Sequence, residues 1–243
     1  NNKTGNKMAK KFWTYLKTDK YDIGLTSKAT YIFDKNGNEK AKFADLSYGN
    51  NGIVSPDQKT LVVKSTDGRI AIYSLEELKL IKKFRFSKVD GSQDDNLIFS
   101  PDGKYLLNIE SHGSSLDTAL TIYDTNDFSP VERLFENDNE HVLSVIEYDE
   151  ASSDYYILAC SRNPIEKQID KCFVAKLVNK RLEEVRYVDE GTFMFFTIAK
   201  QVEFAGFTEE AYKWLFLFGN PKLSELKNMN LSLSNLWKEA SNC

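Results

Sequence analysis

Short apolar segments separated by turn residues follow one another along most of the chain. Within many of them apolar and polar positions alternate, as in Arg-Ile-Ala-Ile-Tyr-Ser at 69–74 and Ala-Leu-Thr-Ile-Tyr-Asp at 119–124. Alternation with a period of two is typical of half-buried β-strands. Gly, Asn, Asp and Pro punctuate the segments, including Asn-Gly at 36–37 and Thr-Asp-Gly at 66–68. The pattern therefore predicts an antiparallel, all-β protein built from hairpins.

One stretch of the pattern occurs twice. Val-Ser-Pro-Asp-Gln-Lys-Thr-Leu-Val-Val at 54–63 aligns with Phe-Ser-Pro-Asp-Gly-Lys-Tyr-Leu-Leu-Asn at 99–108, an offset of 45 residues. In both copies an apolar strand ends at Ser, Pro-Asp forms a tight turn, and Lys leads into a second strand. Proline presets φ for the turn, and the aspartate can accept a hydrogen bond from the backbone two residues on.

Each copy continues with two more predicted strands, at 69–74 and 80–86 in the first and at 119–124 and 131–135 in the second. Four short antiparallel strands per repeat, at a period of 40 to 50 residues, are the sequence pattern of a β-propeller blade.

Two motifs in the second copy resemble a known family. Ser-Pro-Asp-Gly-Lys-Tyr-Leu at 100–106, followed by Thr-Ile-Tyr-Asp at 121–124, is similar to the WD-repeat and related bacterial β-propellers. Tyr123-Asp124 stands where that family often has Trp-Asp, and the Gly-His pair that opens many such repeats is missing, so the chain resembles a divergent member. The resemblance covers residues 52–135. It implies the propeller fold, and a fold of this kind does not by itself specify a function.

Extended to the whole chain, the pattern predicts one propeller domain over 12–243, after a flexible basic arm at 1–11. Five blades are expected, at approximately 12–46, 52–87, 96–137, 141–188 and 192–233. The fifth unit has few turn signals, and residues 231–240 could instead form a short helix capped by Ser234. The alternative architecture is an incomplete ring, completed by a segment upstream of Asn1, because the chain does not begin with Met.

Charge and composition narrow the classes of partner. The chain has 32 Lys plus Arg against 36 Asp plus Glu, a formal net charge of −4, which argues against a dedicated nucleic-acid binder. No apolar run approaches the roughly 20 residues that a membrane span requires. We expect a soluble monomer, either cytoplasmic or secreted after removal of an upstream segment.

Residues with catalytic or metal-binding chemistry are few. The chain has two histidines, His112 and His141, and neither has a second candidate ligand nearby in sequence, so no metal site or cofactor is predicted. The acidic run at 136–154 could hold calcium, but a solvated loop is the preferred interpretation. No nucleophile elbow, catalytic triad or phosphate-binding loop is present. Cys160 and Cys172 could face each other across a hairpin, as buried free thiols or as a disulfide.

The predicted function is non-catalytic recognition of a protein or small-molecule ligand through loops on one face of the ring. The candidate binding residues lie at strand connections: Asp67, Arg69, His112, Asp117, Arg162 and Asn163. Residues 161–171 form the longest irregular hairpin among these connections. Two alternatives stay open. One is a secreted carbohydrate- or lactone-active enzyme with an acidic site on the propeller axis. The other is a sensor module of a longer protein.

Overall fold

Four antiparallel sheets follow one another along the chain, each built as a meander of four sequential strands. The computed structural model describes residues 10–86, 96–111 and 117–242. Blade 1 contains β1 (Thr14–Lys17), β2 (Tyr21–Leu25), β3 (Thr30–Asp34) and β4 (Glu39–Phe43). Blade 2 contains β5 (Asn51–Val54), β6 (Thr60–Lys64), β7 (Arg69–Ser74) and β8 (Lys79–Arg85). Blade 3 contains β9 (Leu97–Phe99), β10 (Tyr105–Ser111), β11 (Thr118–Asp124) and β12 (Ser129–Leu134).

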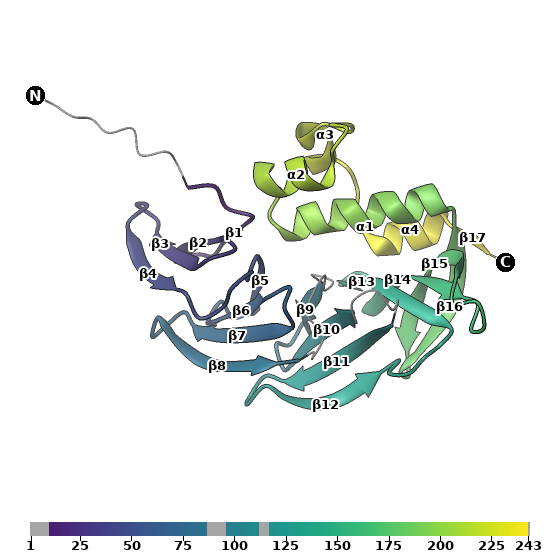
Figure 1. The fold of residues 1–243 in the computed structure, drawn as a ribbon, viewed down its shortest axis with the longest axis horizontal. Helices are drawn as coiled ribbons and strands as arrows, with labels where there is room; N and C mark the ends of the chain where they lie inside the picture. Colours follow the sequence, from purple (N-terminus) through teal and green to yellow (C-terminus); the bar gives the residue numbers. More distant parts are fainter. Residues whose placement is uncertain (1–9, 87–95, 112–116, 243) are drawn as a thin grey trace, which may run out of the picture.

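Blade 4 has the longest strands. It contains β13 (His141–Asp149), β14 (Asp154–Arg162), β15 (Ile169–Val178) and β16 (Arg181–Val188), and the short C-terminal strand β17 (Ser241–Asn242) adds a fifth strand beside β16. In Figure 1 the four blades form an arc, with the first strand of each blade toward the centre and the fourth at the periphery. The arrangement is propeller-like, and four of the five predicted sheets are present.

The two Ser-Pro-Asp turns have the same hydrogen bonds. Ser55 Oγ donates to Asp57 Oδ1 at 2.6 Å and accepts from Thr60 N at 3.0 Å. In the second copy Ser100 Oγ donates to Asp102 Oδ1 at 2.7 Å and accepts from the Tyr105 amide at 3.0 Å. The residue after each aspartate has a positive φ, 60° at Gln58 and 71° at Gly103. The repeated sequence therefore specifies a repeated turn.

Neighbouring blades are held together by an aromatic contact that also repeats. Tyr73 on β7 stacks on Phe43 of blade 1, with ring centroids 4.3 Å apart. Tyr123 on β11 packs on Phe84 of blade 2, with ring centroids 5.3 Å apart. Both tyrosines are buried, and burial raises the pKa of each hydroxyl well above its ordinary value. The third strand of one blade thus anchors the fourth strand of the preceding blade.

The fifth predicted blade, 192–233, is wrong: this part of the chain is helical. It contains α1 (Glu190–Phe204), α2 (Glu209–Leu215), α3 (Leu223–Lys227) and α4 (Leu233–Glu239). The N-terminus of α1 is capped by Asp189, whose carboxylate accepts from Thr192 N at 2.8 Å. Helix α1 is apolar on two sides: Phe193 packs with blade 4 and α4, whereas Val202 packs with α3 and its flanking loops. A helix buried on two sides produces a continuous apolar run, which periodicity cannot distinguish from a buried strand.

The short C-terminal helix, the alternative interpretation of residues 231–240, is present as α4. Its cap is Ser232 rather than Ser234, since the Ser232 hydroxyl accepts from Asn235 N at 3.2 Å. Leu233, Leu236 and Trp237 pack against the face of blade 4 that points away from blade 3. This face would contact the next blade in a longer propeller.

The helical segment returns the chain to blade 1. Helix α1 extends across the open side of the arc toward β1 (Figure 1). There Tyr15 N donates to the carbonyl of Ala205 at 3.0 Å, and the Thr208 hydroxyl donates to the carbonyl of Trp13. The helical segment therefore connects blade 4 to blade 1 across the open side of the arc.

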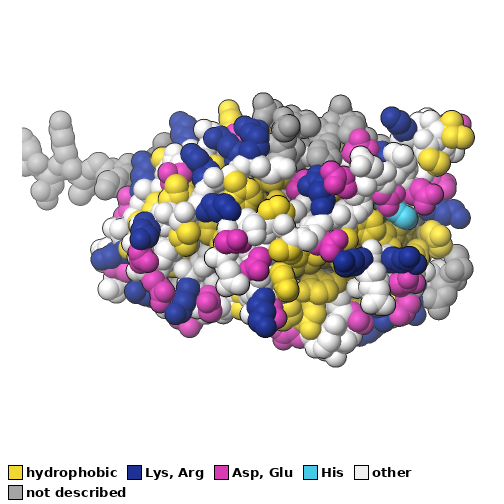
Figure 2. All heavy atoms as spheres, turned by 90° about the horizontal axis from the view of Figure 1, so that it is seen from below, with side chains coloured by type: hydrophobic (Ala, Val, Ile, Leu, Met, Phe, Trp, Pro, Cys, Tyr) yellow, Lys and Arg dark blue, Asp and Glu magenta, His cyan; other side chains and the backbone are white. Residues whose placement is uncertain are grey.

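Seen from the side of the outer strands, basic and acidic side chains are interspersed with hydrophobic ones over the surface (Figure 2). Ile81 on β8 and Val131 on β12 are among the exposed hydrophobic residues, at 54% and 51%. No helix among the residues described is long and apolar enough to cross a membrane. Most of the predicted basic arm, residues 1–9, lies outside the described part of the chain.

Candidate functional site

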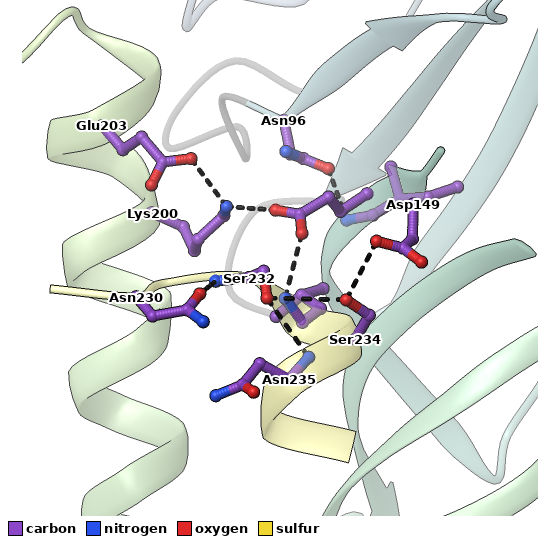
Figure 3. Close-up of polar contacts among 11 residues, drawn as sticks. Asn96, Asp149, Lys200, Glu203, Asn230, Ser232, Ser234 and Asn235 are labelled. Atoms are coloured by element: carbon purple, nitrogen blue, oxygen red, sulfur yellow. Dashed lines mark hydrogen bonds and ion pairs between the residues drawn. The ribbon is translucent and has the colours of Figure 1, made fainter. Parts of the chain in front are cut away.

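The axial side of the inner strands is occupied by a polar network that docks the helices. Lys200 of α1, with 9% of its side chain exposed, forms ion pairs with Glu147 of β13 and, at 2.7 Å, with Glu203. The second oxygen of Glu147 accepts from Leu233 N, at the N-terminus of α4, at 3.0 Å. In Figure 3 the Lys200 ammonium lies between Glu203 and a second carboxylate, which is that of Glu147, and Asp149 is bonded to Ser234 of α4. The network joins α1 and α4 to β13.

This region offers little space for a substrate. The cavity beside Lys200, lined also by Asn96, Ser144 and Thr197, has a volume of about 10 Å³. That is at the lower limit for a single water molecule. The two carboxylates here, Glu147 and Glu203, share the ammonium of Lys200 and do not face each other across an open space. The network therefore supports a structural role.

A larger polar site lies at the connections between strands of blades 3 and 4. The predicted residues Asp67, Asp117 and Arg162 lie at the β6–β7, β10–β11 and β14–β15 connections, the equivalent position in three successive blades. Because each blade has the same up-and-down order, these connections lie on one face of the arc. The β12–β13 loop, residues 135–140, reaches the same face.

Arg162 binds these loops together, although it is nearly inaccessible, with 1% of its side chain exposed. Its guanidinium pairs with Asp117 Oδ1 at 2.8 Å, and its Nε donates to the carbonyl of Asn139 at 2.9 Å. A further bond reaches the carbonyl of Asp138 at 3.3 Å. The fixed fork of an arginine can serve several acceptors in one plane. The predicted pair of Asp117 and Arg162 therefore meets in space, and the buried arginine fixes the loop of blade 3 to the loop that enters blade 4.

A cavity of about 410 Å³ opens beside this arginine. Its lining is polar and consists of Asp117, Thr118, Arg133, Glu136, Asn137, Asp138 and Asn139. Arg133 is held by the buried carboxylate of Glu110 at 2.7 Å and by Glu136 at 3.1 Å. Burial lowers the pKa of Arg133, but the two carboxylates outweigh this effect and keep the pKa above its ordinary value. With three acids and one arginine, the lining is acidic on balance.

Asp138 is the most heavily used acid in this site. Its carboxylate accepts from Glu140 N at 2.6 Å and contacts His141 Nδ1 at 2.8 Å. The His141 ring packs edge-on against Phe173 of β15. Within the described residues, no group of three or more His, Cys, Asp or Glu side chains converges in an arrangement that could hold a metal ion. The acidic run contributes instead to the shape of the loop.

The other candidate residues have local partners. The Arg69 guanidinium binds the carboxylate of Asp67 within the β6–β7 turn. Asn163 Oδ1 accepts from Ile165 N at 2.8 Å and Glu166 N at 3.1 Å, which shapes the β14–β15 loop. His112 lies outside the described residues.

Cys160 on β14 and Cys172 on β15 face each other across the hairpin, as predicted from the sequence. They form a directly opposed pair, and their Sγ atoms are 3.1 Å apart as unbonded, buried thiols. Burial, together with the neighbouring Cys172, raises the pKa of Cys160 well above its ordinary value. In this environment we expect both thiols to be chemically unreactive.

Several important residues were not predicted. Neither Arg133 nor Glu110 belongs to a recognisable sequence motif. The two side chains meet because β12 and β10 lie on either side of β11. Asp138, in the β12–β13 loop, and His141, the first residue of β13, lie three residues apart, which was the local signal for their contact. Lys200 lay in the predicted fifth blade, so its contact with Glu147 could not be found.

Comparisons with known proteins do not show a family for the chain. No protein-family model matches it, and no curated protein is similar to it in sequence. Among solved structures it is similar to the hydrazine synthase of Kuenenia stuttgartiensis, with a TM-score of 0.49 and 13% identity, over 65% of this chain and 46% of that chain. This chain thus spans less than half the length of that protein. A likeness of this strength bears on neither the activity nor the partners of the chain.

Proposed function

We propose that the protein is a non-catalytic recognition scaffold, and that the cavity between blades 3 and 4 binds a protein partner that presents a basic side chain. The single observation that carries the proposal is the buried Arg162, which fixes three loop segments as the walls of a polar cavity on the loop face. Rigid walls favour binding because little conformational entropy is lost when the partner docks.

The charge of the lining indicates the kind of group it accepts. Asp117, Glu136 and Asp138 outnumber Arg133, the one cation among the lining residues. The side chains of Asp117 and Glu136 are 53% and 54% exposed, so both carboxylates can bind an incoming lysine or arginine without a large desolvation cost.

Catalysis fits this site less well than recognition. Each acid is already engaged: Asp117 with Arg162, Glu136 with Arg133, and Asp138 with His141.

The test compares capture by the folded protein and by two charge-reversed variants. Glu136→Lys places a cation in the cavity, whereas Glu183→Lys makes the same change at an exposed position of β16. Proteins from the source organism recovered by the wild type and by Glu183→Lys, but lost with Glu136→Lys, would support the proposal. A partner recovered equally by all three baits would contradict it.

A further inference from the structure

Three of the four most exposed apolar side chains described lie together at the end of α2. Trp214 is 69% exposed, Leu217 78% and Phe218 99%. We refer to these three residues as the apolar tip. They lie on the helical hairpin of α2 and α3, which projects away from the blades in Figure 1. Large apolar side chains clustered on a projection indicate a binding surface.

Contacts within the loop between α2 and α3 hold the apolar tip in place. Phe216 points the other way and stacks on Tyr212, with ring centroids 5.5 Å apart. The Tyr212 hydroxyl donates to the carbonyl of Pro221 at 2.8 Å, across the loop that carries the tip. Phe216 packs against the buried cluster of α1 and α3, whereas Leu217 and Phe218 are exposed.

Basic residues line a groove between α2 and blade 1. A cavity of about 470 Å³ separates α2 from blade 1, and its lining includes Lys11, Lys17 and Lys213. Residues 10–46 hold eight lysines against five acidic residues, net +3, in a chain whose net charge is −4. Glu209 and Glu210 face the same groove and pair with Lys213 and Lys11. The other lysines of residues 10–46 leave blade 1 with a net positive charge.

The outward face of blade 1 carries much of this charge. Tyr31 and Phe33 point away from blade 2, and the Lys10 ammonium lies 3.8 Å from the centre of the Tyr31 ring. Lys42 also lies over Tyr31, at 5.5 Å. Lysine and aromatic side chains in this combination are typical of proteins that bind at the boundary between water and lipid.

We propose that this end of the molecule binds the surface of an anionic lipid bilayer, with the apolar tip inserted among the acyl chains and the lysines of blade 1 at the headgroups. The tip exposes on the order of 500 Å². That is less than the about 800 Å² per partner of a stable protein interface, so a second copy of the chain fits it less well. A bilayer needs no complementary shape, and it attracts basic residues from a distance. The proposal is independent of the cavity between blades 3 and 4.

The test is co-sedimentation with vesicles of phosphatidylcholine, alone or with about one third phosphatidylserine. We expect binding to the anionic vesicles only, and we expect it to weaken as salt is added. Leu217→Ser with Phe218→Ser should reduce binding at least about tenfold, because the inserted apolar surface is lost. The matched control is Ile165→Ser, at a residue that is 90% exposed on the β14–β15 loop.

The charge is tested separately. Lys17→Glu with Lys42→Glu should reduce binding by about 25-fold or more, since each lysine near an anionic surface contributes about fivefold. Lys104→Glu with Lys167→Glu makes the same change in net charge at exposed positions of blades 3 and 4 and should bind like the wild type. Circular dichroism and urea unfolding identify any variant that fails to fold.

Three results would overturn the proposal. The first is a folded wild-type protein that does not sediment with anionic vesicles. The second is a variant of the tip that binds as tightly as the wild type. The third is a wild type that forms dimers in solution while the variant of the tip is monomeric, which would assign the tip to a second copy.

Discussion

Gly206 links the helical segment to blade 1, and an alanine at this position tests that link. Gly206 follows α1 with a φ of +77°, and a Cβ built on it would lie 2.2 Å from the carbonyl oxygen of Tyr15. The adjacent residue, Ala205, accepts the backbone hydrogen bond from Tyr15 N at 3.0 Å. A methyl group can therefore be accommodated only if the backbone of α1 and that of β1 move apart.

The magnitude follows from three contributions. A left-handed conformation costs a non-glycine residue about 1 kcal/mol. Overpacking against a rigid backbone costs about 1–3 kcal/mol more. Loss of the hydrogen bond between Tyr15 and Ala205 adds about 1 kcal/mol. Gly206→Ala should therefore lower the free energy of unfolding by about 3–5 kcal/mol.

Gly37→Ala is the matched control. Gly37 has a φ of +80°, and its Cβ would have no neighbour within 4 Å. Only the conformational cost applies there, about 1 kcal/mol. Urea unfolding followed by circular dichroism measures both variants. Equal losses at the two glycines would refute the conclusion that α1 is packed tightly onto blade 1.

Three further predictions concern the loops, the turns and the thiols. Arg162→Met should lower the free energy of unfolding by about 3 kcal/mol, because several loop acceptors lose a charged donor. Asp117→Asn should lower it by less than about 1 kcal/mol, because Asp117 is half exposed. Similar urea midpoints for the two variants would contradict this expectation. The pKa of Asp57 is lowered in the folded protein, chiefly by the hydrogen bond from the serine two residues earlier. The ionised Asp57 therefore stabilises the fold above the ordinary pKa of about 4. This stabilisation is lost as the pH falls through the lower pKa of the folded state. Asp57→Asn should therefore reduce the loss of stability on acidification, which urea midpoints at neutral and acidic pH would measure, and an unchanged loss would argue against it. Cys160 and Cys172 should resist alkylation at neutral pH in the native state and react fully in denaturant, as mass spectrometry would show; rapid alkylation of the native protein would be inconsistent with their burial.

The sequence predicted the blades well because their signals are local. A Ser-Pro-Asp turn, an alternating strand and a glycine turn each act over a few residues, and the repeat at 45 residues confirmed each one against its copy. Tyr123 was placed correctly because the motif fixes its position on β11. The opposed cysteines followed from the length of one hairpin.

The helical segment could not be predicted because its signal depends on tertiary contacts. Phe193 and Val202 are buried on different sides of α1, against partners far apart in the sequence. The same limit applies to the candidate site. Asp117 and Arg162 were found at turns, but their ion pair depends on how blade 3 packs on blade 4, and Arg133 was found only in the structure.

The most direct test of the recognition role is hydrogen exchange of the protein alone and bound to a partner captured as described. We expect slower exchange in residues 117–118, 135–141 and 162–169, the segments around Arg162, and unchanged exchange in blade 1. Slower exchange confined to other segments, with these three unchanged, would contradict the assignment of the binding site to the cavity between blades 3 and 4.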